Sequence, residues 1–525
     1  MIKDGKILVG KNKKTEVFLL PSMAQRHGLI TGASGSGKTV TSKLIAEGFS
    51  DLGVPVFMAD VKGDLGGCAL PGEMNENISE RVKNLKLTEF DVKSYPVRFW
   101  DVFGVRGHSV RASISSIGPD ILSIMLGLSE AQEGVLDIVF KIAEDERLDI
   151  VNLADLRSLL QYVGDNRQDY ITKYGNITTQ SVGVIQRSLL ALENQGADKF
   201  FGEPELDIKD LIKTDASGKG IINILDAVEL FKSPDLFTSF LLWMLTSLFN
   251  TLPEVGDLDK PKIVFFFDEA HLLFNEIPNY RLKRITQVVK LIRSKGIGLY
   301  FLSQNPTDIP DEIIGQLGNR VQHTLRAYTP AEQKIVKAAA DAFRTNPEFK
   351  TADAILELGK GEALISFQNE KGEPEIVERV TVLPPQSNMG TIDDMTRNKI
   401  INSSDLVGKY DEEIDNESAY EKITEINEAK KAEQDELRRQ KEEEKLRKEE
   451  EKKAKEEEKE RLRQEREAER KAKEEARQKE KEKKEKERKK KNSEVYKMGQ
   501  KVKNRTSSFI LTKLLNSLWK SIFKK

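Results

Sequence analysis

The hydrophobic residues of the first 60 positions alternate between short apolar runs and helical spacing. Residues 6–20 alternate loosely and are rich in β-forming side chains, which predicts one or two short strands. An apolar run at 27–31 leads into a glycine-rich stretch, residues 40–52 have helical spacing, and 54–60 form a second apolar run. This order of strand, loop, helix and strand is the unit from which parallel sheets with crossover helices are built. We therefore expect an α/β fold with a mainly parallel sheet and helices on both of its faces.

The middle of the chain interrupts this pattern. Between about 119 and 215 the apolar residues recur three or four positions apart without strand-like runs, which predicts a helical insertion within the α/β domain. From Gly220 onward near-continuous apolar runs return, a pattern typical of strands buried on both faces of a sheet. The elements predicted there are strands at 221–225, 263–267 and 298–302, helices at 236–252 and 281–295, and edge strands or a hairpin at 361–367 and 376–383.

Composition divides the chain into a globular part, up to about residue 385, and a highly charged tail. The net charge of −2 is therefore the sum over two parts of different composition, the globular part and the tail. It argues against a protein that coats nucleic acid non-specifically over its whole surface, but not against a local basic groove. The boundaries that we predict are an N-terminal β segment at 1–24, two parts of the α/β core at 25–118 and 216–385, the helical insertion at 119–215, a linker at 386–428, a charged arm at 429–492 and a basic amphipathic helix at 493–525.

The predicted arm consists mostly of Glu, Lys, Arg, Gln and Ala. Opposite charges repeatedly lie four positions apart, and each such pair stabilises an isolated helix by roughly a few tenths of a kcal/mol. A coiled coil needs apolar residues at the a and d positions of its heptads, and these are nearly absent here. We therefore expect a lone charged helix or a disordered polyampholyte that acts as a spacer, rather than a coiled coil.

The last segment, 493–525, has a different pattern. Its large apolar residues cover a broad helical face, and Lys513, Lys520 and Lys524 lie together on the other side. A basic amphipathic helix with aromatic residues suits a membrane surface or the groove of a partner protein. The alternative is that this helix docks onto the globular part of its own assembly. Because it follows a long spacer, we favour an anchor.

Cysteine use and hydropathy bear on the compartment. Cys68 is the only cysteine, so no intrachain disulfide can form, and its glycine-rich surroundings predict a small residue in a turn rather than a redox group. The chain has no secretory apolar segment at its N-terminus and no uninterrupted apolar stretch of about 18 residues. We therefore expect a cytoplasmic protein, with peripheral binding at the inner face of the cell membrane as the alternative.

The glycine-rich stretch follows the pattern G-x-x-x-x-G-K-[ST] of a phosphate-binding loop. Glycines let the backbone curl so that its N–H groups point at phosphate oxygens, and the next helix begins with its positive dipole end at the anion. Lys38 supplies a positive charge for the β- and γ-phosphates, and Thr39 supplies a hydroxyl ligand for Mg²⁺. The predicted ATP-binding residues are Gly32, Ala33, Ser34, Gly35, Ser36, Gly37, Lys38 and Thr39.

A second set of candidate residues follows the apolar run 263–267. Asp268 and Glu269 are expected at the carboxyl edge of the sheet, where ligands of open α/β sheets bind. We expect Asp268 to hold Mg²⁺ through water and Glu269 to act as the base that polarises the attacking water. Two acids at a strand end also serve as a helix cap, so this assignment depends on the phosphate loop. His271 is expected to be a packing or supporting residue.

Gln304, which follows the run 298–302, is the third candidate element. A polar amide at this strand end is expected to lie against the γ-phosphate or the attacking water and to couple hydrolysis to movement. The alternative is a polar residue that only starts a loop. Together with the phosphate loop and the paired acids, Gln304 predicts a P-loop ATPase that uses ATP and Mg²⁺.

With these elements in this order, the chain resembles the HerA/FtsK branch of the RecA-like P-loop ATPases. More closely, it resembles the bacterial HerA-like proteins that have a HerA-type C-terminal domain. The stretches that carry the resemblance are 26–32 (RHGLITG), 56–65 (VFMADVKGDL), 265–271 (FFFDEAH) and 302–306 (LSQNP). The resemblance covers about residues 5–385 and not the tail. It implies a RecA-like sheet and a homo-oligomeric, hexameric ring with ATP sites at the subunit interfaces.

The resemblance also implies an arginine that contacts the γ-phosphate bound by the neighbouring subunit. The candidates are Arg326 and Arg293, followed by Arg320. Each of them fits equally well as an ordinary surface or salt-bridged arginine. Asp60 and Asp64, which follow the second apolar run, are expected to support the nucleotide site from behind.

One departure from the family pattern concerns the N-terminus. HerA translocases carry a sizeable N-terminal barrel that helps assembly and docking to a NurA-type nuclease. Only some two dozen residues precede the phosphate loop and its strand here, too few for such a barrel. This departure weighs against a nuclease partner and against transferring DNA-end processing to this chain.

Three functions remain to be compared. The first is an ATP-driven ring motor, a DNA translocase or helicase, in which the DNA track follows from the resemblance alone because the sequence has no base-reading motif. The alternative is a ring ATPase that remodels proteins or acts at a membrane, with its tail as a tether. The third is a nucleotide-gated scaffold without hydrolysis. The intact Lys38, Glu269 and Gln304 argue against it, since a scaffold needs no hydrolytic carboxylate.

Overall fold

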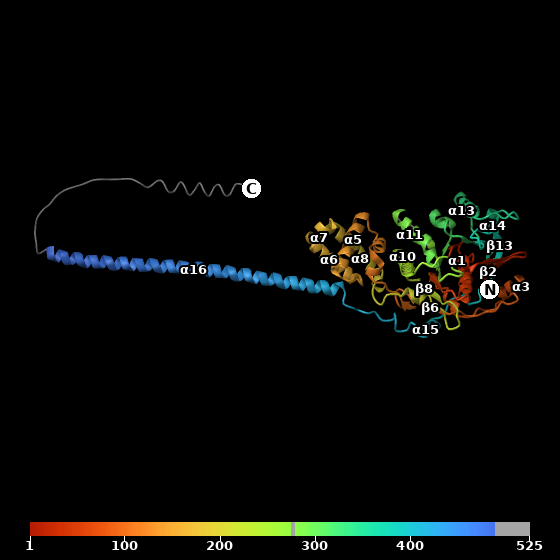
Figure 1. Cartoon of the computed structure of the whole chain (residues 1–525), viewed down its shortest axis with the longest axis horizontal. Coiled ribbons are helices and arrows are strands. Elements are labelled where there is room, and N and C mark those ends of the chain that lie inside the picture. The colour runs from red at the N-terminus through yellow and green to blue at the C-terminus, as the bar shows by residue number, and fades with distance from the viewer. Residues whose placement is uncertain (275–278, 489–525) are drawn as a thin grey trace. The chain divides into compact units, whose positions relative to one another are not determined.

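The computed structural model describes residues 1–274 and 279–488 (Figure 1). The chain divides into two units, residues 1–428 and residues 429–525. The first unit contains every strand of the described residues. The predicted amphipathic helix at 493–525 lies outside the described residues.

The strands of the described residues form one 13-stranded sheet. Its larger part is parallel, in the order β11-β4-β10-β9-β5-β8-β6-β7, and an antiparallel part continues on the β11 side. The prediction of a mainly parallel sheet is thereby confirmed. The parallel strands are β4 (Gly28–Thr31), β5 (Val56–Asp60), β6 (Val97–Asp101), β7 (His108–Ser109), β8 (Ile222–Asp226), β9 (Ile263–Phe267), β10 (Ile297–Ser303) and β11 (Asn319–Gln322). The antiparallel strands are β1 (Ile2–Lys3), β2 (Lys6–Lys11), β3 (Glu16–Leu19), β12 (Glu362–Ser366) and β13 (Glu378–Val382).

Helices cover both faces of the parallel strands, as predicted. On one face α2 (Lys38–Asp51) packs Phe49 against a cluster that includes Phe266 of β9. On the other face α10 (Pro234–Thr251) belongs to a cluster that includes Phe265 of β9. Neighbouring residues of a strand point to opposite faces, so a strand covered on both sides has no polar face. This explains why all five residues of β9 are apolar and buried.

Shorter helices and 3₁₀ turns connect these elements. They are α1 (Pro21–Ala24), η1 (Gly66–Ala69), α3 (Glu76–Asn84), η3 (Leu230–Lys232), η4 (Ala270–Leu273), α11 (Asn279–Ile292), η5 (Arg293–Lys295), η6 (Pro306–Asp308), α12 (Asp311–Ile314), α13 (Pro330–Asp341) and α14 (Thr351–Glu357). The helices α13 and α14 form a third apolar cluster with β12. This cluster covers the sheet where its parallel part meets its antiparallel part.

A group of helices lies between β7 and β8, where the helical insertion is predicted (Figure 1). They are α4 (Ile114–Met125), α5 (Glu130–Glu146), α6 (Leu153–Asp165), α7 (Arg167–Tyr174), α8 (Thr179–Glu193), η2 (Ala197–Lys199) and α9 (Ile208–Leu211). The helix α4 begins five residues before the predicted boundary at 119 and is interrupted at Gly118, where φ is 75°. Capping boxes at Ser129 and Asn152 fix the starts of α5 and α6. The insertion shares one apolar core with α10 and the sheet.

Residues 386–428, which the sequence assigns to a linker, lie against the rest of the first unit. They include α15 (Asp394–Asn402), whose Arg397 is only 2% exposed and donates to Asp226 Oδ2 over 3.1 Å. The segment begins on α2, where Glu47 accepts the backbone N–H groups of Gln386 and Ser387. It ends on the insertion, where Ser418 Oγ donates to Asp155 over 2.5 Å. These contacts are polar, and the buried apolar residues of the segment, such as Leu406 and Tyr410, are scattered, so no apolar run marked the packing in the sequence.

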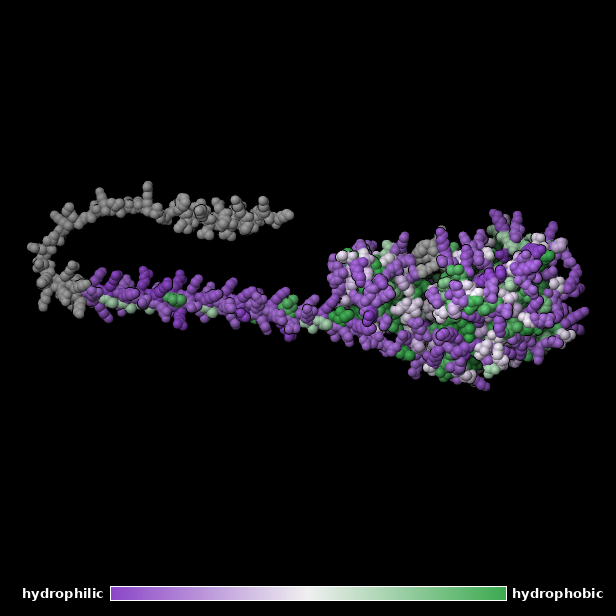
Figure 2. Space-filling model, viewed as in Figure 1, coloured by the Kyte–Doolittle hydropathy of each residue, from purple (hydrophilic) through white to green (hydrophobic). Residues whose placement is uncertain are grey.

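The charged arm is a single helix, α16 (Ala419–Arg488), as far as the described residues extend. Its first turns belong to the first unit, and Ile423 is buried there. From residue 429 to residue 481 every side chain is exposed. Figure 2 shows a hydrophilic surface along α16 that is interrupted only by isolated apolar residues. At 1.5 Å per residue the helix is about 105 Å long. None of the helices within 1–274 and 279–488 combines the length and the apolar character needed to span a bilayer.

The buried Arg397 provides a test of the segment 386–428. Replacing it by Met keeps most of its length but leaves Asp226 with Arg106 as its remaining arginine partner. Breaking a buried ion pair exposes the desolvation cost of the remaining charge, and we expect Arg397→Met to lower the free energy of unfolding by about 3 kcal/mol. Urea unfolding followed by tryptophan fluorescence measures this change. Lys14→Met, which removes the exposed pair with Glu348, is the control and should leave the midpoint unchanged. Equal midpoints for the two variants would show that the Arg397–Asp226 contact does not hold residues 386–428 in place.

Candidate active site

The predicted phosphate loop, residues 32–39, connects β4 to α2. Three of its glycines have positive φ angles: 152° at Gly32, 75° at Gly35 and 120° at Gly37. Gly37 is the N-cap of α2, and no side chain there caps the helix. The first amides of α2 therefore have no side-chain partner at the cap, and together with the helix dipole they form a site for an anion.

Lys38 is the first residue of α2 and is 7% exposed. Its Nζ lies 2.6 Å from Gly32 O and 3.3 Å from Ala33 O, so the side chain folds back over the loop. Burial lowers the pKa of Lys38, and the charge of Asp268 opposes this change. A buried ammonium group that bonds only to carbonyl oxygens has no hydrogen-bonded anion of its own. It is therefore suited to bind a phosphate.

Asp268 and Glu269 follow β9 at the same edge of the sheet. The N–H group of Glu269 donates to Asp268 Oδ1 over 2.9 Å, and Glu269 has a left-handed backbone with φ of 49°. Burial raises the pKa of Asp268, while the positive charge of Lys62 opposes this change. Glu269 is 8% exposed, and its Oε2 lies 3.4 Å from Nδ1 of His271. His271 thus lies beside the predicted base.

Lys62 faces both carboxylates and was not among the residues predicted for the site. Its Nζ lies 3.6 Å from Glu269 Oε1 and 3.8 Å from Asp268 Oδ2. Burial lowers its pKa, but the two carboxylates outweigh this effect and the pKa of Lys62 is raised. Its position in the loop directly after β5 was the available signal, because that loop opens onto the same edge as the phosphate loop.

Asp60, predicted to support the site, ends β5 and is 2% exposed. It accepts the N–H groups of Gly63, Asp64 and Leu65 at 2.7 to 3.1 Å. Burial raises the pKa of Asp60 to about 6. Asp60 therefore holds the loop that carries Lys62, and Asp64 contributes a backbone N–H group to the same turn.

Gln304 directly follows β10 and its side chain is exposed. Ser303 pairs with Thr31 of β4, so Gln304 is level with Gly32 of the phosphate loop. The next residues form a capping box in which Asn305 and Asp308 bond to each other's backbone. The structure therefore places Gln304 at the edge of the sheet where the other candidates lie, and its role in catalysis stays a prediction.

The three candidate arginines have different surroundings. Arg326 is exposed, follows β11, and its side chain forms no hydrogen bond or ion pair with the described residues. Arg293 lies before the amino end of β10, at the other edge of the sheet, and donates to Asp257 at 2.7 Å. Arg320 donates to the carbonyl oxygens of Ile314, Leu317 and Ala342. These backbone contacts give Arg320 a structural task, and the role of any arginine across a subunit interface stays a prediction.

A nucleotide and Mg²⁺ fit the residues that are present. Two buried oxygens at the site, Ser36 Oγ and Glu269 Oε2, have no hydrogen-bond partner. Within residues 1–274 and 279–488 no group of three or more His, Cys, Asp or Glu side chains could hold a metal ion unaided. Mg²⁺ is usually held by one or two protein ligands together with the phosphates of its substrate. Thr39 and Asp268 are the residues that would hold it here.

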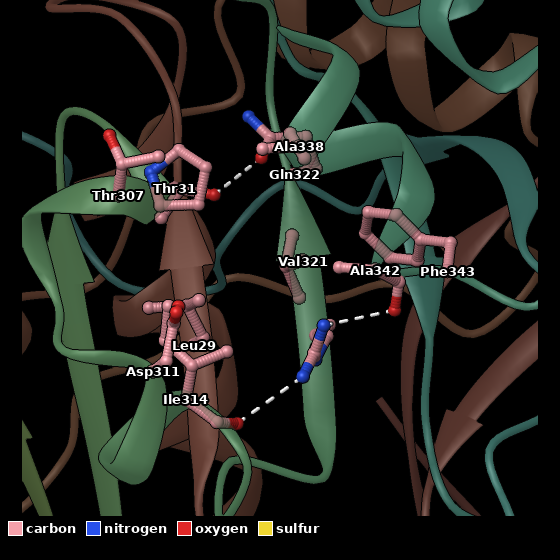
Figure 3. Close-up of a pocket in the computed structure, with 13 residues that line it drawn as sticks. Leu29, Thr31, Thr307, Asp311, Ile314, Val321, Gln322, Ala338, Ala342 and Phe343 are labelled. Carbon is pink, nitrogen blue, oxygen red and sulfur yellow. Dashed lines mark hydrogen bonds between the residues drawn. The ribbon is translucent and has the colours of Figure 1, made fainter. Parts of the chain in front are cut away.

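The candidate residues lie at the strand ends and do not line a deep cavity. A cavity of about 410 Å³ opens beside β4 and β11. Thr31 and Gln322 line it and bond to each other, and Phe343 lies on its other side (Figure 3). Lys38 and the two acids are not part of this lining. The cavity is thus a neighbour of the phosphate loop and not the place where phosphates would bind.

The model of the family described as "Helicase HerA-like C-terminal" matches residues 6–522. The chain belongs to this family. The expected resemblance to HerA-like ATPases is confirmed. The match extends past residue 385, where we expected the resemblance to end, and takes in α16. The simple composition of the arm had offered no motif from which this could be foreseen.

The chain is also similar, at low identity, to curated proteins and to solved structures. The DNA double-strand break repair helicase HerA of Saccharolobus solfataricus is 22% identical over 418 residues, which cover 78% of this chain and 72% of the relative. The protein of the same name from Sulfolobus acidocaldarius is 24% identical over 368 residues, covering 68% and 65%. The bacterial conjugative coupling protein TrwB matches with a TM-score of 0.47 at 12% identity, covering 73% of this chain and 92% of TrwB. VirB4 of Thermoanaerobacter pseudethanolicus matches with a TM-score of 0.46 at 15% identity, covering 73% and 97%.

Two glycines of the phosphate loop give a matched pair of variants. A Cβ at Gly32 would meet His323 Cβ at 2.5 Å and Ser36 Oγ at 2.8 Å, whereas a Cβ at Gly35 would meet nothing within 4 Å. We expect Gly32→Ala to displace the loop at a cost of about 2 kcal/mol, which weakens ATP binding roughly 30-fold. Gly35→Ala changes only the backbone preference, at about 1 kcal/mol or roughly fivefold. Titration with a fluorescent ATP analogue measures both affinities. Equal losses would show that contact with His323 does not shape the loop.

Proposed function

We propose that this protein hydrolyses ATP with Mg²⁺ in a homo-oligomeric ring and couples hydrolysis to movement on DNA. The observation that carries the proposal is the convergence of Lys38, Asp268 and Glu269 on one edge of a parallel sheet. Two curated relatives bear the name of a DNA repair helicase, and this name supports DNA as the track. The hexameric number of subunits rests on the family resemblance.

The residues of the chain divide the reaction between them. The loop amides and Lys38 hold the phosphates, and Lys38 must leave Gly32 O to reach them. Glu269 orients the attacking water through its Oε2, which has no hydrogen-bond partner, and takes up the proton as the new P–O bond forms and the bond to the ADP leaving oxygen breaks. Bound Mg²⁺ supplies positive charge that neutralises the phosphate oxygens. In this proposal Gln304 has the task of contacting the γ-phosphate or the attacking water, which would couple hydrolysis to movement.

The exposed Arg326 is our first candidate for the arginine that acts across a subunit interface. An exposed cation that forms no hydrogen bond or ion pair with the described residues of its own subunit is available to a phosphate bound by a neighbour. Its segment is tied to its own phosphate loop, because Ala33 N donates to Thr324 O over 2.8 Å. Two successive sites of a ring would thereby be connected.

A second candidate function is a ring ATPase that remodels proteins or acts at a membrane. The long exposed helix α16 favours it, since a motor that only tracks DNA has no evident need of a charged spacer of about 105 Å. Both functions use the same ATP site. They differ in what stimulates hydrolysis.

ATP hydrolysis by the purified full-length protein, with and without double-stranded DNA, separates these functions. We expect DNA to raise the rate several-fold, because a motor completes its cycle on its track. Lys38→Ala and Glu269→Gln should abolish hydrolysis, and Glu269→Gln should still bind ATP because the phosphate loop is intact. Hydrolysis that DNA does not change would favour the second candidate. A wild-type protein that binds ATP and never hydrolyses it would overturn the enzyme itself.

Mixing two inactive variants tests the arrangement across subunits. In a mixed ring, the intact phosphate loop of an Arg326→Ala subunit can face a Lys38→Ala subunit whose Arg326 is present. We therefore expect each variant alone to be inactive and the mixture to recover part of the hydrolysis. Arg293→Ala mixed with Lys38→Ala is the comparison, since Arg293 already pairs with Asp257. If Arg326→Ala mixed with Lys38→Ala recovers no hydrolysis and Arg293→Ala mixed with Lys38→Ala does, Arg293 and not Arg326 is the arginine that acts across the interface.

A further inference from the structure

His323 is a buried histidine that lies against the phosphate loop. It follows β11 directly and is 0% exposed. Its Nε2 lies 2.9 Å from Oγ1 of Thr41 in α2, and its Nδ1 lies 2.9 Å from the carbonyl oxygen of Glu362 in β12. One side chain therefore joins the phosphate-binding helix to two strands that are distant in sequence.

The two contacts fix the form of the ring. A carbonyl oxygen can only accept, so Nδ1 carries the proton and donates to Glu362 O. The neutral ring then accepts at Nε2, and the Thr41 hydroxyl donates to it. Burial lowers the pKa of His323 to about 4, which agrees with a neutral ring at physiological pH. The Thr41 hydroxyl, which in a helix commonly bonds back to the preceding turn, is used instead to fasten α2 to β11.

The same strand ends hold the loop at three further points. His323 N donates to Thr31 O over 2.7 Å, Ala33 N donates to Thr324 O, and Gly361 N donates to Ser36 O. Thr31 also bonds through its side chain to Gln322, the residue before His323 (Figure 3). The loop thus lies on a platform formed by the carboxyl end of β11 and the start of β12.

The ring also fits the shape of the loop. Gly32 lies so close to His323 that a Cβ would overlap its Cβ, and a Cβ at Gly37 would come within 3.5 Å of its Cε1. Thr41 lies one helical turn after Lys38 and two residues after Thr39. A shift of the imidazole ring would therefore move the turn of α2 that carries both groups.

We propose that His323 is a positioning residue for ATP hydrolysis, which holds Lys38 and Thr39 in place through its hydrogen bond with Thr41 and connects the phosphate loop to the segment that carries Arg326. The inference rests on the proposed function, since it assigns a role within the same site. His323 does not touch the phosphates. It acts by fixing the first turn of α2 on β11, and Arg326 follows only three residues later on the same segment.

Two variants break the same hydrogen bond from its two ends. Thr41→Val replaces the hydroxyl by a methyl group of similar size. His323→Asn keeps a donor near the place of Nδ1, for Glu362 O, but does not reach Thr41. Thr41→Ser retains the hydroxyl. Ser50→Ala is the matched control, because it removes a buried hydrogen bond of 2.6 Å to Gly220 O from the far end of the same helix.

Steady-state ATP hydrolysis, together with thermal unfolding of each full-length variant, tests the role. We expect Thr41→Val and His323→Asn each to lower kcat about tenfold while KM for ATP changes less than about threefold, because misplacement is felt most in the transition state. The double variant should lose no more than either single variant, since both remove one interaction. Thr41→Ser should recover most of the rate, and Ser50→Ala should keep the wild-type kcat.

The outcomes separate this inference from the proposed function. If the wild type hydrolyses ATP and Thr41→Val has the kcat of Ser50→Ala, with only a lower unfolding temperature, His323 is a structural residue and the inference is wrong. Losses that multiply in the double variant would equally contradict it. If the wild type does not hydrolyse ATP at all, the proposed function is wrong, and the role of His323 in hydrolysis is wrong with it.

Discussion

The register of the parallel strands fixes where every candidate group of the site lies. Asp60 of β5 pairs with Asp226 of β8. The pair Met58–Phe266 puts Asp268 at the same level as Asp60, and the pair Trp100–Leu225 puts Asp101 at the same level as Asp226. Four aspartates therefore end four adjacent strands in one row, about 4.8 Å apart from strand to strand. Like charges at this spacing repel one another, so each carboxylate needs its own compensation.

The surrounding structure provides this compensation in different ways. Asp60 and Asp101 each accept three backbone N–H groups from the loop that follows them. Asp226 is held by Arg106 and by the buried Arg397, which explains why residues 386–428 must lie against the sheet. Asp268 differs from the other three, because it faces a lysine that is half exposed and accepts one backbone N–H group. Asp268 is thus the carboxylate of the row with the fewest hydrogen bonds, and it is the one beside the phosphate loop.

The sequence predicted those parts of the molecule that depend on local pattern. The phosphate loop, the paired acids and the strands of the sheet could be read from glycine spacing and from apolar runs, because these patterns are dictated by backbone geometry and by burial on both faces. The wrapping of 386–428, the pairing of Lys62 with the acids and the contact of His323 with α2 could not. The last two are made by single polar residues far apart in sequence, and residues 386–428 combine such polar contacts with scattered apolar residues such as Leu406 and Tyr410, so only the folded chain brings these groups together.

The hydrogen bonds of Lys38 within the phosphate loop can be tested directly by nucleotide binding. Lys38 bonds to the carbonyl oxygens of its own loop, so binding of a nucleotide must replace these bonds by contacts with phosphate. The most direct measurement is an experimental structure of the full-length protein with Mg²⁺ and a non-hydrolysable ATP analogue. The account predicts phosphates within hydrogen-bond distance of Lys38 and the loop amides, Mg²⁺ beside Thr39 and Asp268, and Glu269 facing the γ-phosphate, with the Thr41–His323 contact retained. A nucleotide bound elsewhere, with Lys38 still on Gly32 O, would contradict it.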